Sequence, residues 1–323
     1  MAKIVIFGGY GAVGREAARE LVVSGRKVVL AGRNPDRAKA IPGAEMVRVD
    51  TTDPEQVRSA LADASAVLMC TESQNAEVAR ASFERGIHYL DVTASYPVIC
   101  ALEALHESAV ANNAVGVLSV GLIPGVSNLL ARSVFERSSA DEVGIGAVLG
   151  SGETHGPAAI RWTLDGLGSL PGSWAMDFPT GRRSVHRFPF SDQYTLPRTL
   201  GASQVRTGLA MDSRLLTALL AAARLPGLAK VMRSRAAAAA LGRIHVGSDR
   251  FALKAESGTA GAWFTGRRQS RATGVVAAML VERLDRFPAG VRHIEELVDP
   301  DEFLSSLNAY GFESGNVSGP RSV

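Results

Sequence analysis

The stretch that decides the fold is KIVIFGGYGAVGREAAREL, residues 3–21, at the start of the chain. Its apolar run, residues 3–7, has the length and the β-branched content of a buried parallel strand. Three glycines follow with the spacing G-x-G-x-x-G: Gly9, Gly11 and Gly14. Strong helix formers occupy residues 15–22, and a second apolar strand is expected at 27–31. This order of strand, glycine turn, helix and strand predicts a dinucleotide-binding unit.

Each part of the glycine turn has a physical reason. The first glycine permits the tight turn, the second lets a pyrophosphate approach the backbone, and the third lets the helix pack on the strand. The first turn of the helix also offers free N–H groups to phosphate oxygens. We therefore expect the pyrophosphate of a dinucleotide to be bound by Gly8, Gly9, Tyr10, Gly11, Ala12, Val13 and Gly14.

The end of the second strand, in VVLAGRNPDR, residues 28–37, indicates which dinucleotide is bound. Proteins that bind NAD place an acidic residue about 20 positions beyond the glycine turn, where it accepts a hydrogen bond from the ribose 2′-hydroxyl. Here that region reads Ala31-Gly32-Arg33, and an arginine can pair with a 2′-phosphate and stack on adenine. The sequence thus predicts NADP(H), held at this end by Arg33, Asn34 and Arg37, the last of them if a helix begins at NPDRAKA.

Composition limits the remaining possibilities. The chain has 323 residues, enough for two domains, and a net charge of +3 with dispersed basic residues, which does not favour nucleic acid. Two cysteines exclude a disulfide framework and indicate a reducing compartment, so we expect a cytoplasmic protein. The longest apolar stretch, residues 215–223, is too short to span a bilayer. The histidines show no metal-ligand spacing, and no metal is expected.

Strands and helices alternate through residues 44–120, which predicts a doubly wound parallel sheet and hence an α/β Rossmann domain. Ligands bind beyond the carboxyl ends of the strands in such sheets. The polar residues at these ends are therefore the remaining expected cofactor contacts: Asp50, Thr51, Thr71, Glu72, Ser73 and Thr93.

Four motifs together resemble the saccharopine dehydrogenase-like (saccharopine reductase) family: GGYGAVG, AGRNPDRA, VARASFERGIHYLDVTA and SVGLIPGVSNLLA. The closing segment ATGVVAAMLVERL…HIEELVDPDEFLSSLNAYGF is similar to the final helices of that family. The resemblance implies a Rossmann domain at 1–125, a second α+β domain at 126–268 and C-terminal helices at 269–312 that return to the Rossmann domain. It also implies oxidation or reduction of a C–N bond with NADP(H) or NAD(H), and a homodimer formed through the second domain. The Gly- and Ser-rich residues 313–323 are expected to be a mobile tail.

The sequence departs from the family at two places. The Gly-Glu that follows the fifth strand in the family is Ala94-Ser95 here, and the family's Asp before Pro-Gly is Ile123. Both changes remove carboxylates from the expected nicotinamide pocket. The substrate is therefore expected to be a more apolar imine, or an activated C=C, rather than an amino acid.

Two polar segments of the second domain carry the candidate proton donors. One is GSGETHGPAAIRWTLDGLG, residues 150–168, and the other is FPFSDQY, residues 188–194. We rank His155 first, because it titrates near neutrality on a glycine-rich loop, then Tyr194 and then Tyr96. A capping or packing role remains an alternative for each of these residues.

Three functions follow in order. The first is an NADPH-dependent oxidoreductase that reduces a C=N bond of a small-molecule substrate in a biosynthetic pathway. The second is an NADPH-dependent reductase of C=C or C=O. The third is a non-catalytic protein that senses NADPH, since a Rossmann fold does not by itself imply turnover.

Overall fold

The computed structural model describes residues 3–37, 39–153, 163–166, 169–213, 217–218 and 247–318. The chain forms two compact units, each built around its own sheet. The first unit is Met1–Gly125 with Ser270–Leu297, and the second is Val126–Gln269 with Val298–Val323.

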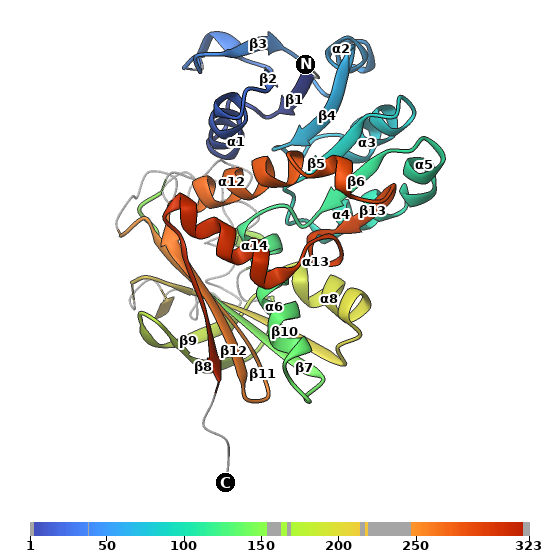
Figure 1. The fold of residues 1–323 in the computed structure, drawn as a ribbon. Helices are drawn as coiled ribbons and strands as arrows, with labels where there is room; N and C mark the ends of the chain where they lie inside the picture. Colours follow the sequence, from blue (N-terminus) through green and yellow to red (C-terminus); the bar gives the residue numbers. More distant parts are fainter. Residues whose placement is uncertain are drawn as a thin grey trace. The chain divides into compact units, whose positions relative to one another are not determined.

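The first unit contains a seven-stranded sheet in which every paired strand is parallel (Figure 1). The spatial order is β13-β6-β5-β4-β1-β2-β3. The strands are β1 (Lys3–Phe7), β2 (Lys27–Gly32), β3 (Ala44–Arg48), β4 (Ala64–Met69), β5 (His88–Asp91), β6 (Val115–Leu118) and β13 (Gly290–His293). The order reverses at β1, where the chain first builds outward to β3 and then returns to β4. The predicted α/β Rossmann fold is confirmed.

Helices cover both faces of this sheet. One core joins alternate residues of β1, Val5 and Phe7, to residues of α2 (Pro54–Ala60), α3 (Asn75–Phe83), α4 (Tyr96–Glu103) and α5 (His106–Ala111). On α1 (Ala12–Val23) the buried face includes Ala17, Ala18 and Leu21. The short α13 (Ile294–Leu297) ends this unit.

A returning helix, α12 (Gln269–Val281), packs against α1 through a glycine. A Cβ added to Gly274 would lie 2.6 Å from the Cβ of Glu16 and 2.7 Å from the backbone nitrogen of Ala17. The residues of α12 from Val275 to Val281 are all buried. The absence of a side chain at Gly274 is what allows this close approach of two helices.

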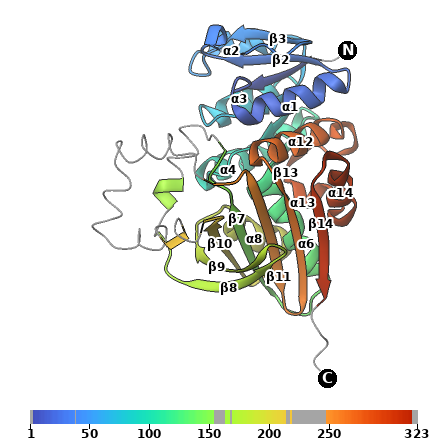
Figure 2. The ribbon, with the colours of Figure 1, turned by 90° about the vertical axis from the view of Figure 1, so that its left-hand side faces the viewer.

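The second unit contains a mixed seven-stranded sheet, ordered β14-β12-β11-β7-β10-β9-β8 (Figure 2). Only the pair β7–β10 is parallel among these described pairs. The strands are β7 (Glu142–Leu149), β8 (Ser173–Phe178), β9 (Gly181–Arg187), β10 (Gln204–Met211), β11 (Arg250–Ser257), β12 (Ala260–Arg267) and β14 (Glu313–Ser318). The helix α6 (Ser127–Glu136) packs on β7, β11 and β12, and α8 (Asp192–Leu200) packs on β10.

Two expectations about the C-terminus are wrong. Residues 313–318 are not a mobile tail, because β14 pairs with β12 over six register positions from Glu313 to Ser318. These main-chain hydrogen bonds need no apolar side chains, so a polar, Gly-containing segment can form an edge strand. The preceding helix α14 (Pro300–Ser306) belongs to the second unit, where the Ser133 hydroxyl donates to Asp301 at 2.8 Å.

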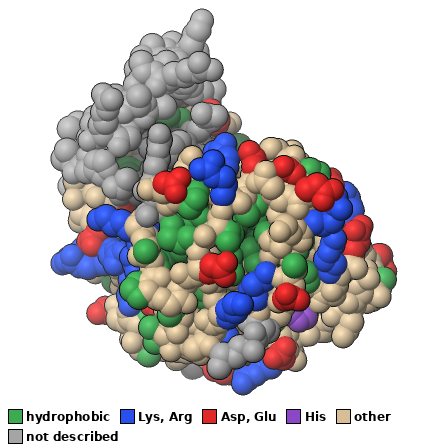
Figure 3. All heavy atoms as spheres, turned by 90° about the horizontal axis from the view of Figure 1, so that it is seen from above, with side chains coloured by type: hydrophobic (Ala, Val, Ile, Leu, Met, Phe, Trp, Pro, Cys, Tyr) green, Lys and Arg blue, Asp and Glu red, His purple; other side chains and the backbone are tan. Residues whose placement is uncertain are grey.

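Two local expectations also need correction. The helix expected at 97–112 is two helices, α4 and α5, which meet at residues 104–105. Pro35–Arg37 forms a single 3₁₀ turn rather than the start of an α-helix. Within the described part of the chain, no helix is long and apolar enough to cross a membrane. On the face drawn in Figure 3, Lys and Arg side chains are interspersed with Asp and Glu, as on an ordinary solvated surface.

Candidate functional site

The glycine turn between β1 and α1 cannot accept side chains. Gly8 has a φ of +71°, and a Cβ there would lie 2.7 Å from the carbonyl oxygen of Cys70. A Cβ on Gly9 would lie 2.8 Å from the Ile6 carbonyl oxygen, and one on Gly14 would lie 2.7 Å from the Cα of Gly9. The three glycines therefore keep the turn tight and close to the sheet, as the motif requires.

The start of α1 is available to an anion. Its N-cap, Gly11, has no side chain to bond the first N–H groups, and the first turn carries no acidic residue. Free N–H groups and the positive end of the helix dipole favour a phosphate at this position.

Tyr10 fills the space in which an acidic residue at the end of β2 would project. A Cβ on Gly32 would lie 2.8 Å from two carbons of the Tyr10 ring. The Tyr10 hydroxyl donates to the carbonyl oxygen of Val47 at 2.6 Å and to that of Leu30 at 3.2 Å, so the ring is held against β2 and β3. No side chain, acidic or otherwise, fits at position 32 while the ring is there.

Arg33 is exposed directly after Gly32. Within the described parts of the chain its guanidinium has no hydrogen-bond or ion-pair partner. Its charge contributes to lowering the pKa of Asp50, although the backbone N–H and the hydroxyl of Thr52 are the larger causes. Asn34 is exposed beside Arg33, and the side chain of Arg37 lies outside the described atoms.

The loops that follow β3, β4 and β5 are joined by side-chain hydrogen bonds. The Thr51 hydroxyl donates to the Ser73 hydroxyl at 2.8 Å, and the Thr93 hydroxyl donates to Glu72 at 2.7 Å. Thr71 belongs to the same group, because its carbonyl oxygen accepts from the Asn75 side chain at 3.1 Å. The structure thus brings together the polar residues expected at the carboxyl edge of the sheet.

A buried carboxylate, Asp91, lies beneath these loops and was not among the predicted site residues. It is 1% exposed and accepts hydrogen bonds from Tyr89 at 2.6 Å, from the Asn75 side chain at 2.8 Å and from the Thr93 backbone N–H at 2.8 Å. Burial raises the pKa of Asp91 to about 7 despite these three donors, and the charge of Glu72 adds to the rise. An acidic residue that ends an otherwise apolar strand, as in HYLD, is the sequence signal for such a group.

A second buried array lies at the ends of β6 and β13. His293, 3% exposed, contacts the Ser119 hydroxyl through Nδ1 at 2.8 Å and Glu103 through Nε2 at 2.9 Å. Burial opposes its positive charge, but the hydrogen bond from Glu103 and the nearby charges of Glu295 and Glu296 raise the pKa of His293 above its ordinary value. Ser119 is 1% exposed, so its hydroxyl is positioned to link two strands and not to attack a substrate.

The three candidate proton donors are not gathered into one described site. His155 lies outside the described residues. Tyr96 is half-buried at the start of α4 in the first unit, and Tyr194 is 39% exposed on α8 in the second unit. Their proposed roles therefore remain predictions.

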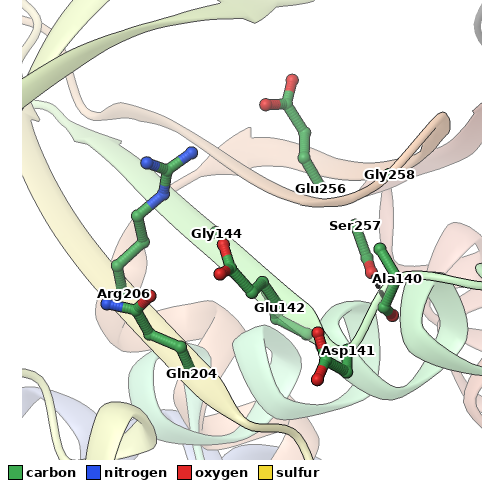
Figure 4. Close-up of a pocket in the computed structure, with 10 residues that line it drawn as sticks. Ala140, Asp141, Glu142, Gly144, Gln204, Arg206, Glu256, Ser257 and Gly258 are labelled. Atoms are coloured by element: carbon green, nitrogen blue, oxygen red, sulfur yellow. Dashed lines mark hydrogen bonds between the residues drawn. The ribbon is translucent and has the colours of Figure 1, made fainter.

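The second unit contains a polar cavity of about 350 Å³ that the sequence did not indicate (Figure 4). Gly144 on β7 pairs with Arg206 on β10 and with Glu256 on β11, so the cavity opens over a glycine flanked by long charged side chains. The guanidinium of Arg206 lies 5.0 Å from the ring of Trp174, and the ammonium of Lys254 pairs with Glu256 at 2.5 Å. No group of three or more His, Cys, Asp or Glu side chains in the described residues is placed to hold a metal ion.

Comparison with known proteins agrees with this geometry. The model of the NAD(P)H-binding family matches residues 8–123, which include the glycine turn and the loops described above. No curated protein matches the sequence.

Two solved structures share the fold over nearly the whole chain. Saccharopine dehydrogenase (L-Glu forming) from Saccharomyces cerevisiae has a TM-score of 0.67 at 13% identity, covering 98% of this chain and 100% of that chain. Amine dehydrogenase from Mycobacterium smegmatis has a TM-score of 0.53 at 11% identity, covering 92% of this chain and 96% of that chain.

The class of protein is now defined. The first unit is an NAD(P)-binding Rossmann domain, and the chain as a whole has the fold of saccharopine dehydrogenase. The resemblance inferred from the sequence motifs is confirmed at the level of the fold.

Proposed function

We propose that the protein is an NADPH-dependent oxidoreductase that transfers hydride to a C=N bond of a small molecule. The observation that carries the choice of NADPH is the end of β2, where Tyr10 occupies the space of an acidic side chain and Arg33 follows with an unpaired guanidinium. A ribose 2′-hydroxyl would find no carboxylate on β2, whereas a 2′-phosphate would find a planar cation.

The remaining contacts support a bound dinucleotide. The start of α1 offers N–H groups to the pyrophosphate, and the linked loops with Thr51, Ser73, Glu72 and Thr93 form the edge along which the rest of the cofactor would extend. When bound, the nicotinamide supplies the hydride, and the protein supplies orientation and electrostatics.

The choice of a C=N bond draws support from the fold and from the chemistry. Both solved structures of this fold carry names of dehydrogenases for saccharopine or amines. An iminium also arrives with its proton in place, so its reduction needs no strong general acid, and the structure shows no described Tyr or His in an evident donor site.

Reduction of C=C or C=O is the second candidate. The observation that favours it is the apolar character of the loops after β5 and β6, where Ala94, Ser95 and Ile123 stand. A pocket without carboxylates suits a substrate without an ammonium group.

The proposal is tested by fluorescence titration of the purified protein with NADPH and with NADH. We expect tighter binding of NADPH, and Arg33→Ala should weaken NADPH binding by about 10- to 100-fold, since a charged hydrogen bond contributes about 1.5–3 kcal/mol. NADH binding should change little. The NADPH effect should shrink at high salt, because Arg33 is exposed.

Arg80→Ala is the matched control, because Arg80 is also an exposed arginine of the first unit but pairs with Glu77 on α3. It should leave both affinities unchanged. Equal affinity for the two dinucleotides, or an Arg33→Ala variant that binds NADPH normally, would contradict the proposed cofactor preference. Tight NADPH binding without turnover of imines, enones or ketones would indicate a sensor in place of an enzyme.

A further inference from the structure

The stretch RFPFSDQ, residues 187–193, contains buried polar atoms that the described protein leaves unsatisfied. Among the described residues, no hydrogen-bond partner is found for Nε of Arg187, Oγ of Ser191 or Nε2 of Gln193. Ser191 is 0% exposed and Gln193 is 9% exposed. A buried donor without an acceptor destabilises a folded protein, so three in seven residues call for an explanation.

Ser191 is the N-cap of α8 but does not cap the helix. Its backbone has helical angles, φ −62° and ψ −25°, and its side chain makes no capping hydrogen bond. Elsewhere in the chain the N-caps Asp53 and Asp299 do bond the first N–H groups of their helices. The hydroxyl of Ser191 is therefore held away from the role that serine usually has at this position.

The three donors belong to one local cluster. Arg187 Nη2 lies 3.4 Å from Gln193 Oε1, which places these two side chains in contact, and Ser191 precedes Gln193 by two residues at the start of the same helix. The neighbouring carboxylate of Asp192 accepts the hydroxyl of Ser127 at 2.5 Å. In the described part of the chain, no acidic side chain forms an ion pair with Arg187.

The cluster also lies where two segments singled out by the sequence meet. A Cβ on Gly166 would lie 2.7 Å from the ring of Phe188, and the backbone N–H of Arg187 donates to the carbonyl oxygen of Gly172 at 3.0 Å. The described ends of the glycine-rich segment therefore pack against the start of RFPFSDQ. Polar groups brought together in this way, within the unit that does not hold the cofactor, are suited to a substrate.

We propose that Arg187, Ser191 and Gln193 bind a carboxylate of the substrate. The unsatisfied atoms are an N–H of a guanidinium, a hydroxyl and an amide NH₂, so the missing partner is an acceptor, and the one charge among them is positive. A carboxylate has several lone pairs and a negative charge, and it satisfies all three donors at once. This inference rests on the proposed function, because it names the substrate class as a carboxylic acid that carries the reducible bond elsewhere.

The inference predicts that binding and stability respond in opposite directions. Ser191→Ala and Gln193→Met remove unsatisfied polar groups without changing the size of the side chain greatly, so the ligand-free variants should melt at the same temperature as the wild type or higher. A residue with a merely structural bond would lower the melting temperature when removed. Asp299→Ala, which deletes a working N-cap in the same unit, is the control and should lower it.

Carboxylate binding is measured by the shift of melting temperature with acetate, propionate, succinate and glutarate, and with the matching neutral amides. At least one carboxylate should stabilise the wild type, with an apparent affinity at least tenfold lower in both variants, while its amide has no effect. NADPH binding, titrated separately, should be the same in wild type and variants. A wild type that binds NADPH but is stabilised by none of the carboxylates refutes this inference and leaves the proposed function standing. Destabilised Ser191→Ala and Gln193→Met variants that keep the carboxylate response would also refute it.

Discussion

Asp91 makes the stability of the first unit depend on pH in a direction opposite to that of an ordinary acid. Its carboxylate is buried below the loops after β4 and β5, and burial raises its pKa from 3.8 to about 7. The folded state therefore binds this proton more tightly than the unfolded chain. The resulting stabilisation is present at pH values below 4 and is lost as pH rises through 7.

The magnitude follows from the two pKa values. Each pKa unit corresponds to about 1.4 kcal/mol, so the free energy of unfolding should fall by roughly 4 kcal/mol across the whole window and by roughly 3 kcal/mol between pH 5 and pH 8. Solvent screening is small, because the side chain is 1% exposed.

The hydrogen bonds explain how the neutral acid is accommodated. The Tyr89 hydroxyl lies 2.6 Å from Asp91 and 3.2 Å from the carbonyl oxygen of Asn75, so it can accept the acid proton and donate onward to the backbone. Asp91→Asn keeps the shape, but its NH₂ group must face either the Asn75 amide or the Thr93 N–H. This clash should cost about 1–3 kcal/mol at all pH values.

The assay is urea unfolding of the wild type and of Asp91→Asn from pH 5 to pH 8.5. The variant should be less stable at pH 5 and should approach or exceed the wild type at pH 8. Asp53→Asn is the control, because Asp53 is an exposed cap whose pKa is lowered and whose contribution runs in the other direction. Parallel stability profiles for the wild type and Asp91→Asn would refute the reasoning.

The remaining predictions concern two contacts of the first unit. Gly32→Ala should destabilise the protein and weaken NADPH binding, because its Cβ would lie 2.8 Å from the Tyr10 ring, and a second change, Tyr10→Ala, should recover part of the stability; a double-mutant cycle in urea with no coupling would contradict this contact. His293→Gln should lose stability chiefly at low pH, since the raised pKa of His293 gives a stabilisation that is present below about 6.5 and lost as pH rises through the higher folded value. The difference from wild type should narrow between pH 6 and pH 9 in thermal melts, and a constant difference would show that Glu103 does not stabilise a charged imidazole.

Much of the first unit could be predicted because its signals are local. A buried parallel strand is apolar throughout, a glycine turn needs Gly8, Gly9 and Gly14 for steric reasons, and helices begin and end at residues with particular backbone preferences. These rules act within a few residues of one another. The polar residues at the strand ends could also be named, because parallel strands bring their carboxyl ends to one edge.

The second unit was predicted less well because its structure depends on distant pairing. The polar segment Glu313–Ser318 becomes a strand only because β12, about fifty residues earlier, offers a free edge. Ser191 has the position of a helix cap, and only its surroundings show that the hydroxyl is buried without a partner. The candidate donor His155 lies outside the described residues, so its role stays a prediction.

The amino-acid sequence by itself determined the class of the protein, an α/β Rossmann domain that binds a nicotinamide dinucleotide, because periodicity and glycine spacing are properties of neighbouring residues. The tertiary structure decided which side chains share a space: the Tyr10 ring fills the place of an acid beside Gly32, and Asp91 lies buried among Tyr89, Asn75 and Thr93. Burial and the resulting pKa depend on atoms brought together from several strands, and no local pattern contains that information.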